Sequence, residues 1–162
     1  MSPSFQPAAG SGRPDVAGLV ARGIDFCRQD DWERGLAILG HLAQAAEKSA
    51  LSGLFYSYLG YGIARCERRV EEGKKLCQHA IRIEFYQPEN YFNLARTQLL
   101  GNDRRGAVSA IFKGLKIDPN SLELLTLQRE LGVRRGPVIP FLSRDNPLNR
   151  LLGRLRHAVS GR

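Results

Sequence analysis

Small residues recur at matched positions along this chain, and their spacing constrains the fold more than any other feature. They form two series, Gly23, Gly60 and Ala95, and then Gly35, Gly73 and Ala107. Within a unit the two small residues are 12, 13 and 12 positions apart, and successive units are offset by 34 to 38 positions. An internal period of this length is typical of proteins built from stacked supersecondary units.

Each unit is predicted to be a pair of antiparallel helices. Small side chains where two helices cross allow the backbones to approach closely. A larger apolar residue follows each second small residue by four positions, so it lies on the same helix face. These larger residues are Leu39, Cys77 and Ile111. Polar turn signals separate the two helices at residues 29–31, 67–69 and 101–103.

Gly60 and Gly62 form a G-x-G sequence, which raises the question of a phosphate-binding loop. A dinucleotide-binding loop also needs a preceding strand, a third glycine and an acidic residue further on. The sequence offers none of these, so we interpret Gly60 as a helix-packing residue. No G-x-S-x-G, H-E-x-x-H or Walker sequence occurs, and the three histidines are scattered. We therefore expect no enzyme activity, no metal site and no cofactor.

The pattern resembles the tetratricopeptide repeat (TPR) family, whose helix–turn–helix unit has about 34 residues. The third unit, residues 91–120, matches at Tyr91, Leu94-Ala95, Ala107, Ile111 and Pro119. The second unit matches at Tyr56, Leu59-Gly60, Gly73, Cys77 and Ala80, with one extra residue in its turn. The first unit matches at Gly23, Phe26, Trp32, Gly35 and Leu39, although Arg22 stands in place of the usual leucine.

The resemblance implies an all-α fold, a TPR-like α-solenoid of helical hairpins with a capping helix and a basic C-terminal tail. The repeat domain would span residues 16–132, with units at about 16–50, 53–87 and 88–120 and a cap at 121–132. Residues 1–15 are rich in Pro, Ser and Gly and lack a signal-peptide pattern, so we expect a disordered N-terminal arm. The tail would span residues 133–162.

The resemblance also implies a concave groove lined by the first helix of each unit. The implied groove residues are Val20, Ile24, Arg28, Ser57, Tyr61, Arg65, Phe92, Asn93, Arg96 and Leu100. Most are spaced four apart, as one face of a helix requires. Guanidinium groups can bind a carboxylate through two hydrogen bonds, so an acidic or C-terminal peptide segment is the expected partner. The alternative is that the arginines are solvated surface, paired with acids of the same chain.

The tail carries most of the chain's positive charge. The net charge is +8, and residues 133–162 hold seven arginines and one acid. Apolar residues at helical spacing predict a short amphipathic helix after Pro147. The expected interaction residues are Phe141, Leu148, Arg150, Leu151, Leu152, Arg154, Leu155 and Arg156. The tail could dock in cis, associate with a second copy, bind another protein, or contact an anionic membrane or nucleic acid.

The sequence thus predicts a non-catalytic protein–protein interaction module, acting as an adaptor, scaffold or assembly factor. One alternative is a peripheral binder of anionic membrane or nucleic acid that works through the tail. Another is a small secretion chaperone. Three cysteines without a C-x-x-C pair read as small core residues of a reducing compartment, so a cytoplasmic location is expected.

Overall fold

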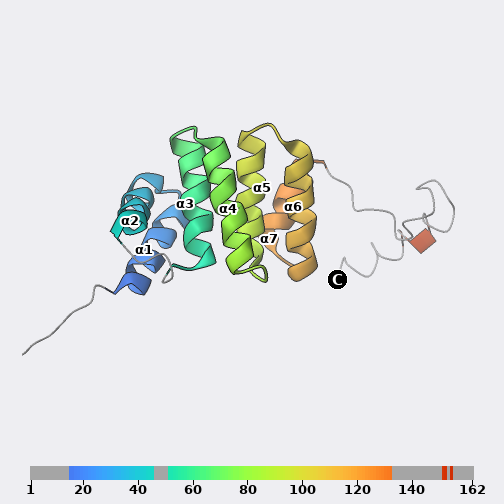
Figure 1. Cartoon of the computed structure of the whole chain (residues 1–162). Coiled ribbons are helices and arrows are strands. Elements are labelled where there is room, and N and C mark those ends of the chain that lie inside the picture. The colour runs from blue at the N-terminus through green and yellow to red at the C-terminus, as the bar shows by residue number, and fades with distance from the viewer. Residues whose placement is uncertain (1–14, 46–50, 133–150, 153, 155–162) are drawn as a thin grey trace, which may run out of the picture. The chain divides into compact units, whose positions relative to one another are not determined.

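The computed structural model describes residues 15–45, 51–132, 151, 152 and 154. Within these residues the regular elements are all helices, as the sequence predicts (Figure 1). The seven helices are α1 (Val16–Arg28), α2 (Trp32–Ala45), α3 (Gly53–Cys66), α4 (Val70–Ile83), α5 (Pro88–Leu100), α6 (Arg104–Ile117) and α7 (Leu122–Glu130).

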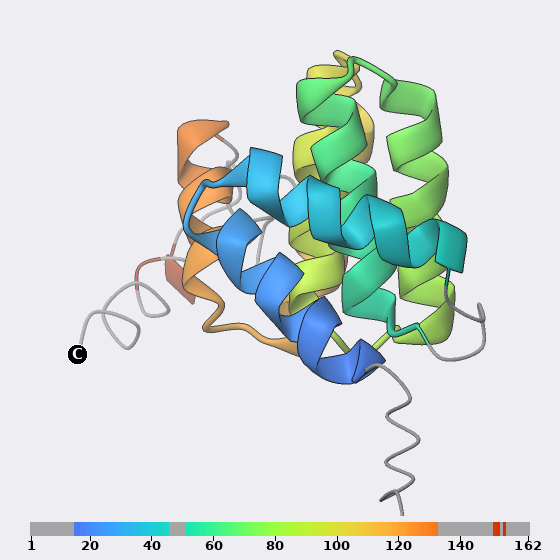
Figure 2. The ribbon, with the colours of Figure 1, turned by 90° about the vertical axis from the view of Figure 1, so that its left-hand side faces the viewer.

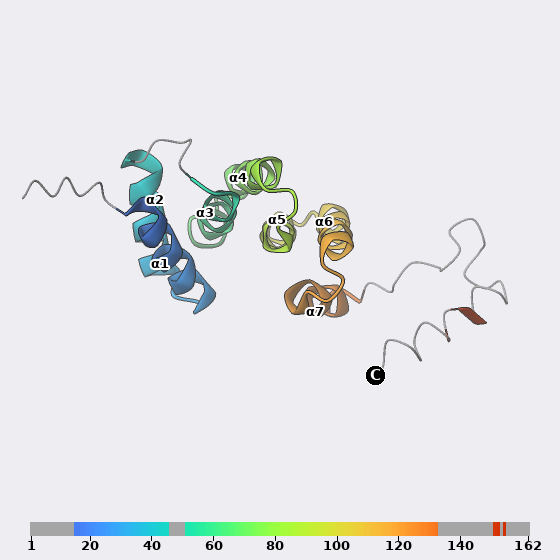
Figure 3. The same cartoon turned by 90° about the horizontal axis from the view of Figure 1, so that it is seen from below.

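The helices up to Leu125 form one compact unit. In it, α1 with α2, α3 with α4, and α5 with α6 are hairpins, and the α3–α4 and α5–α6 pairs lie side by side (Figures 1 and 3). The α1–α2 hairpin crosses α3 and α4 steeply (Figure 2). A second unit begins at Thr126. Its described part consists of residues 126–132 and the helical residues Leu151, Leu152 and Arg154.

The repeated small residues lie where the helices of a hairpin meet. A Cβ atom added to Gly60 would lie 2.6 Å from the carbonyl oxygen of Gly73. A Cβ atom on Gly73 would in turn clash with the carbonyl oxygen of Gly60. In the first hairpin, a Cβ atom on Gly35 would lie 3.0 Å from the Gly23 carbonyl oxygen. Gly60 is therefore a helix-packing glycine.

The turns between the two helices of each hairpin share a backbone conformation. Asp30, Arg68 and Asn102 have φ angles of 64°, 61° and 58°. This left-handed region suits Asp and Asn better than a long side chain such as that of Arg68. The turn therefore repeats along the chain even where its residue type changes.

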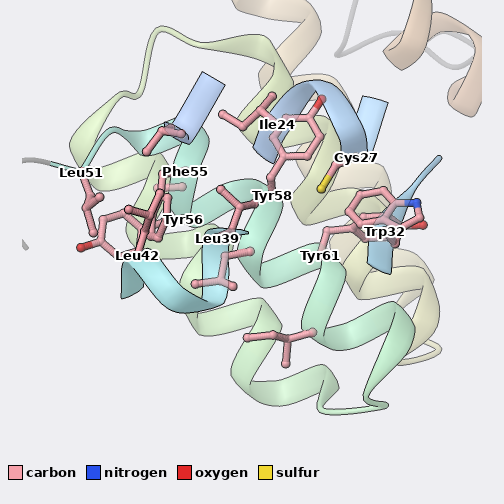
Figure 4. Close-up of a cluster of buried hydrophobic side chains, with 14 residues drawn as sticks. Ile24, Cys27, Trp32, Leu39, Leu42, Leu51, Phe55, Tyr56, Tyr58 and Tyr61 are labelled. Atoms are coloured by element: carbon pink, nitrogen blue, oxygen red, sulfur yellow. The ribbon is translucent and has the colours of Figure 1, made fainter. Parts of the chain in front are cut away.

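The hydrophobic core of the first two hairpins joins α1, α2 and α3 (Figure 4). Phe55 and Leu39 are fully buried at its centre. The ring of Trp32, the first residue of α2, contacts Tyr61 edge-on with the centroids 5.0 Å apart. The steeply crossing hairpin is thus attached to α3 by aliphatic side chains such as Leu39 and by the ring of Trp32.

Buried polar groups join α3, α4 and α5. The Asn93 amide donates to the Ser57 hydroxyl at 2.9 Å. The Thr97 hydroxyl donates to the Asn93 carbonyl oxygen at 2.8 Å, and Sγ of Cys77 lies 3.6 Å from the same hydroxyl. Burial raises the pKa of the Cys77 thiol to about 12. These contacts satisfy polar groups that would otherwise destabilise the interior.

Candidate functional site: a first-helix face with two hollows

The predicted groove residues divide into buried residues and half-buried or exposed ones. The buried ones are Val20, Ile24, Ser57, Tyr61 and Asn93. The half-buried or exposed ones are Arg28, Arg65, Phe92, Arg96 and Leu100. Ser57 and Asn93 lie inside the α3–α5 contact and bond to each other. Both side chains are buried beneath the face and present no atoms to a partner in this conformation.

Two hollows open on the face that α1 and the beginnings of α3 and α5 form. The first, of about 280 Å³, is lined mainly by apolar side chains: Ala17, Val20, Ala21, Ile24, Asp25, Arg28, Ser52 and Leu54. The second, of about 310 Å³, is mainly polar and is lined by Arg28, Gln87, Pro88, Glu89, Phe92, Asp118, Ser121 and Glu123. Arg28 lines both hollows. The two hollows therefore adjoin along its side chain.

Arg28 is held by carboxylates of its own chain. Its Nε and Nη2 atoms donate to the two carboxylate oxygens of Glu89 at 3.1 and 2.8 Å. The Tyr58 hydroxyl donates to the same carboxylate, and Asp25 pairs with Nη1 at 3.4 Å. The Glu89 hydrogen bond is the main reason that the pKa of Arg28 is raised. The two-bond mode expected for a ligand carboxylate is thus occupied by Glu89.

Arg65 also pairs within the chain. It lies 3.0 Å from Asp30 in the α1–α2 turn. The Trp32 indole N–H donates to Asp30 at 2.7 Å, and this bond is the main cause that lowers the pKa of Asp30. The predicted alternative, in which the arginines pair with acids of the chain, describes both Arg28 and Arg65.

Arg96 lies against aromatic rings. Its guanidinium carbon is 3.8 Å from the ring centroid of Tyr61 and 5.0 Å from that of Phe92. The Trp32 centroid is 5.9 Å away. A cation stacked on an aromatic face is attracted to the ring quadrupole. Arg96 thereby covers Tyr61, and neither Arg96 nor Arg65 lines either of the two hollows described above.

Sequence reasoning missed the acidic lining of the second hollow. Glu89 lies in the first turn of α5, and Asp118 and Glu123 flank the α6–α7 turn. Their charges are far apart in the sequence, so only the folded chain brings them together. A signal was present for Glu89, because it lies three positions before Phe92 on one face of α5.

Of the tail residues, the structure describes Leu151, Leu152 and Arg154, which are helical. Leu151 is exposed. The predictions for Phe141, Leu148, Arg150, Leu155 and Arg156, and for the N-terminal arm, lie outside the described residues.

Within the part of the chain that the structure describes, His, Cys, Asp and Glu side chains form no group of three that could hold a metal ion. The described helices also include none with the length and apolar character needed to span a bilayer.

Comparisons with solved structures identify the fold. No protein-family model and no curated protein sequence matches the chain. The first TPR domain of human RPAP3 superposes with a TM-score of 0.59 at 12% identity, covering 72% of this chain and 89% of that one. The first TPR of Spaghetti (RPAP3), bound to the HSP90 peptide SRMEEVD, superposes with a TM-score of 0.58 at 12% identity, with coverages of 72% and 92%.

A third structure agrees. The second TPR domain of human RPAP3, in complex with the HSP70 peptide SGPTIEEVD, gives a TM-score of 0.56 at 15% identity, covering 74% of this chain and 96% of that one. This chain has the TPR fold. The hairpins, the packing glycines and the left-handed turns are thus the features of a TPR array, and the two hollows lie on its first-helix face.

Proposed function

We propose that this chain is a non-catalytic module that binds a segment of a partner protein on its first-helix face, as an adaptor, scaffold or assembly factor. The observation that supports this proposal is the pair of adjoining hollows that share Arg28. Together they offer an apolar recess next to a polar one, which suits a peptide that alternates side chains of these kinds.

The neighbours in the structural comparison support a peptide as the partner. Two of the three solved TPR domains hold short chaperone peptides. Both of those peptides are acidic, as is the segment expected from the sequence. In this chain Glu89 already occupies the two-bond contact at Nε and Nη2 of Arg28, so an acidic segment would compete with Glu89 for it.

The chemistry of the cysteines supports a place inside the cell. Cys27, Cys66 and Cys77 are free thiols; Cys27 and Cys77 are core residues, whereas Cys66 is exposed and the core prediction is wrong for it. Burial raises the pKa of Cys27 to about 12, so this thiol stays protonated and unreactive. Such thiols suit a reducing compartment, and we propose the cytoplasm.

Site-specific photo-crosslinking tests the location of the binding face. A photoreactive phenylalanine derivative replaces Ala21, which is exposed and lines the apolar hollow. A control chain carries it at Lys75, an exposed residue of α4. We expect a discrete crosslinked partner in cell extract from position 21 and none from position 75. Equal crosslinking from both positions, or none from position 21, would contradict the proposal.

Ala21 serves better than the arginines suggested by the sequence. An Arg65→Glu and Arg96→Glu double variant would remove the cation that covers Tyr61 and the ion pair with Asp30. Loss of binding in that variant could then come from altered packing rather than from a lost ligand contact.

A further inference from the structure

We propose that the partner segment carries a cationic side chain, Lys or Arg, which enters the acidic hollow beside Phe92 while a neighbouring apolar side chain enters the α1 hollow. This inference rests on the proposed function and specifies the class of its ligand. It differs from the acidic segment that the sequence suggested.

The first argument is the charge of the lining. The two hollows are lined by four carboxylates, Asp25, Glu89, Asp118 and Glu123, and by one guanidinium, that of Arg28. The lining therefore has a net charge of −3, in a chain whose net charge is +8. Complementary potentials favour a cationic partner and disfavour an acidic one.

The second argument is that the only guanidinium of the lining is already neutralised. Glu89 holds it through two hydrogen bonds and Asp25 lies 3.4 Å from it. A ligand carboxylate that made the same two-bond contact would replace Glu89, and one that approached Nη1 would lie close to Asp25. Exchange of one carboxylate for another gains little, and the displaced Glu89 would add a further negative charge to the hollow.

The third argument concerns the two carboxylates on the other side of the polar hollow. Asp118 accepts the backbone N–H of Asn120, and Glu123 accepts the Ser121 hydroxyl. Among the described residues no cation lies within ion-pairing distance of either carboxylate. Phe92 lines the same hollow and offers an aromatic surface that can contact the methylene stem or the charge of a Lys or Arg.

The experiment is a selection from a phage-displayed library of random 12-residue peptides against the full chain. We expect the selected pool to be enriched in Lys and Arg next to apolar residues. The Asp118→Asn and Glu123→Gln double variant keeps the hydrogen-bond acceptors of both side chains. It should bind the selected peptides about tenfold more weakly, a change of about 1.4 kcal/mol that the loss of two exposed charge contacts can account for.

Two further variants separate a loss of charge at the polar hollow from other causes of weaker binding. Glu33→Gln with Glu71→Gln removes the same charge from exposed positions of α2 and α4, and should leave binding unchanged. Ala21→Gln should obstruct the apolar hollow and weaken binding of the whole pool.

The results separate the two proposals. Failure to enrich any peptide, or a pool that binds Ala21→Gln as tightly as the unmodified chain, would contradict the proposed function. A pool that needs the face but is enriched in Asp and Glu would overturn the cationic ligand and leave the binding face standing. Unchanged affinity of the selected peptides for the Asp118→Asn and Glu123→Gln variant would likewise overturn the cationic ligand and leave the binding face standing.

Discussion

Two glycines of this chain have opposite surroundings. A Cβ atom on Gly60 would meet the carbonyl oxygen of Gly73, the side chain of Leu76 and Sγ of Cys77, all within 3.0 Å. A Cβ atom on Gly40, inside α2, would meet nothing within 4 Å. The same substitution should therefore change stability in opposite directions at the two sites.

We expect Gly60→Ala to lower the free energy of unfolding by about 1–3 kcal/mol, because the backbones of α3 and α4 must move apart. Gly40→Ala should raise it by about 0.5–1 kcal/mol, because alanine loses less entropy in a helix. Chemical denaturation of both variants measures the two changes. A loss of stability in Gly40→Ala as large as that in Gly60→Ala would contradict the packing role of Gly60.

The three thiols should differ in reactivity. Cys66 is exposed, whereas Cys27 and Cys77 are buried with pKa values raised to about 12. The thiolate is the reactive form. In the folded chain at pH 8 we expect an alkylating reagent to modify Cys66 first and the other two only after addition of denaturant. Peptide mass spectrometry resolves the sites, and early modification of Cys77 would contradict its burial.

The same burial makes stability depend on alkaline pH. An unfolded thiol releases its proton near pH 9, whereas the folded thiols of Cys27 and Cys77 keep theirs up to about pH 12. Between these values the unfolded chain binds fewer protons, so the free energy of unfolding should fall as pH rises. Below pH 9 both states are protonated and the thiols add no pH dependence. Urea unfolding at several pH values measures this. The free energy of unfolding should fall less steeply with rising pH in Cys27→Ala than in the unmodified chain.

At the scale of the element, the turns of the hairpins show where the sequence departs from what its backbone favours. Asp30 and Asn102 suit the left-handed conformation, but Arg68 occupies it in the α3–α4 turn. The cost to an ordinary L-residue is about 1–2 kcal/mol. Arg68→Asn should therefore raise the free energy of unfolding by about 0.5–1 kcal/mol and the Tm by about 2–4 °C. Calorimetry tests this, with Arg105→Asn, at an exposed position in α6, as the comparison.

The sequence predicts the helices well because the repeat encodes backbone contact. A small residue at Gly60, followed 13 positions later by Gly73, is needed only where two helices touch, so the spacing determines the hairpin. Because the chain must reverse direction between these two residues, the left-handed turn also falls between them. The steep crossing of the first hairpin (Figure 2) was not predictable, because it depends on how side chains of α1 and α2, Trp32 among them, pack against α3.

The face was predicted less well. A position on the inner side of a helix shows which way a side chain points but not what covers it. Tyr61 and Asn93 point inward, yet a guanidinium covers one and a neighbouring helix buries the other. The partner of Arg28 is Glu89, 61 positions away, and no local pattern joins the two residues. The negative charge of the two hollows likewise follows only from the folded chain, which brings their carboxylates together.

At the scale of the whole molecule, the first hairpin is attached differently from the other two. The α3–α4 and α5–α6 hairpins stack through a buried polar network and closely packed helices. The α1–α2 hairpin is attached through the apolar cluster that includes Trp32, which is 6% exposed, and through the ion pairs of Arg28 and Arg65. The first hairpin also reaches the third through the ion pair of Arg28 with Glu89, which is at the surface. Stability in a repeat array is largely local, so a terminal unit can open while the others stay folded.

Trp32→Ala should therefore release the α1–α2 hairpin before the rest of the described unit unfolds. Loss of a buried tryptophan costs about 3–5 kcal/mol, and the loss here falls on the contact with Tyr58 and Tyr61. Hydrogen exchange should accelerate by about 100-fold or more in α1 and α2, with much smaller changes in α5 and α6.

Tyr86→Ala, which removes an exposed aromatic ring from the α4–α5 turn, is the matched control and should leave exchange in all helices nearly unchanged. A uniform acceleration across α1 to α6 in Trp32→Ala would show instead that the unit unfolds as one. Because both hollows include α1 residues, an open first hairpin would also abolish peptide binding, so the ligand should slow exchange most strongly in α1.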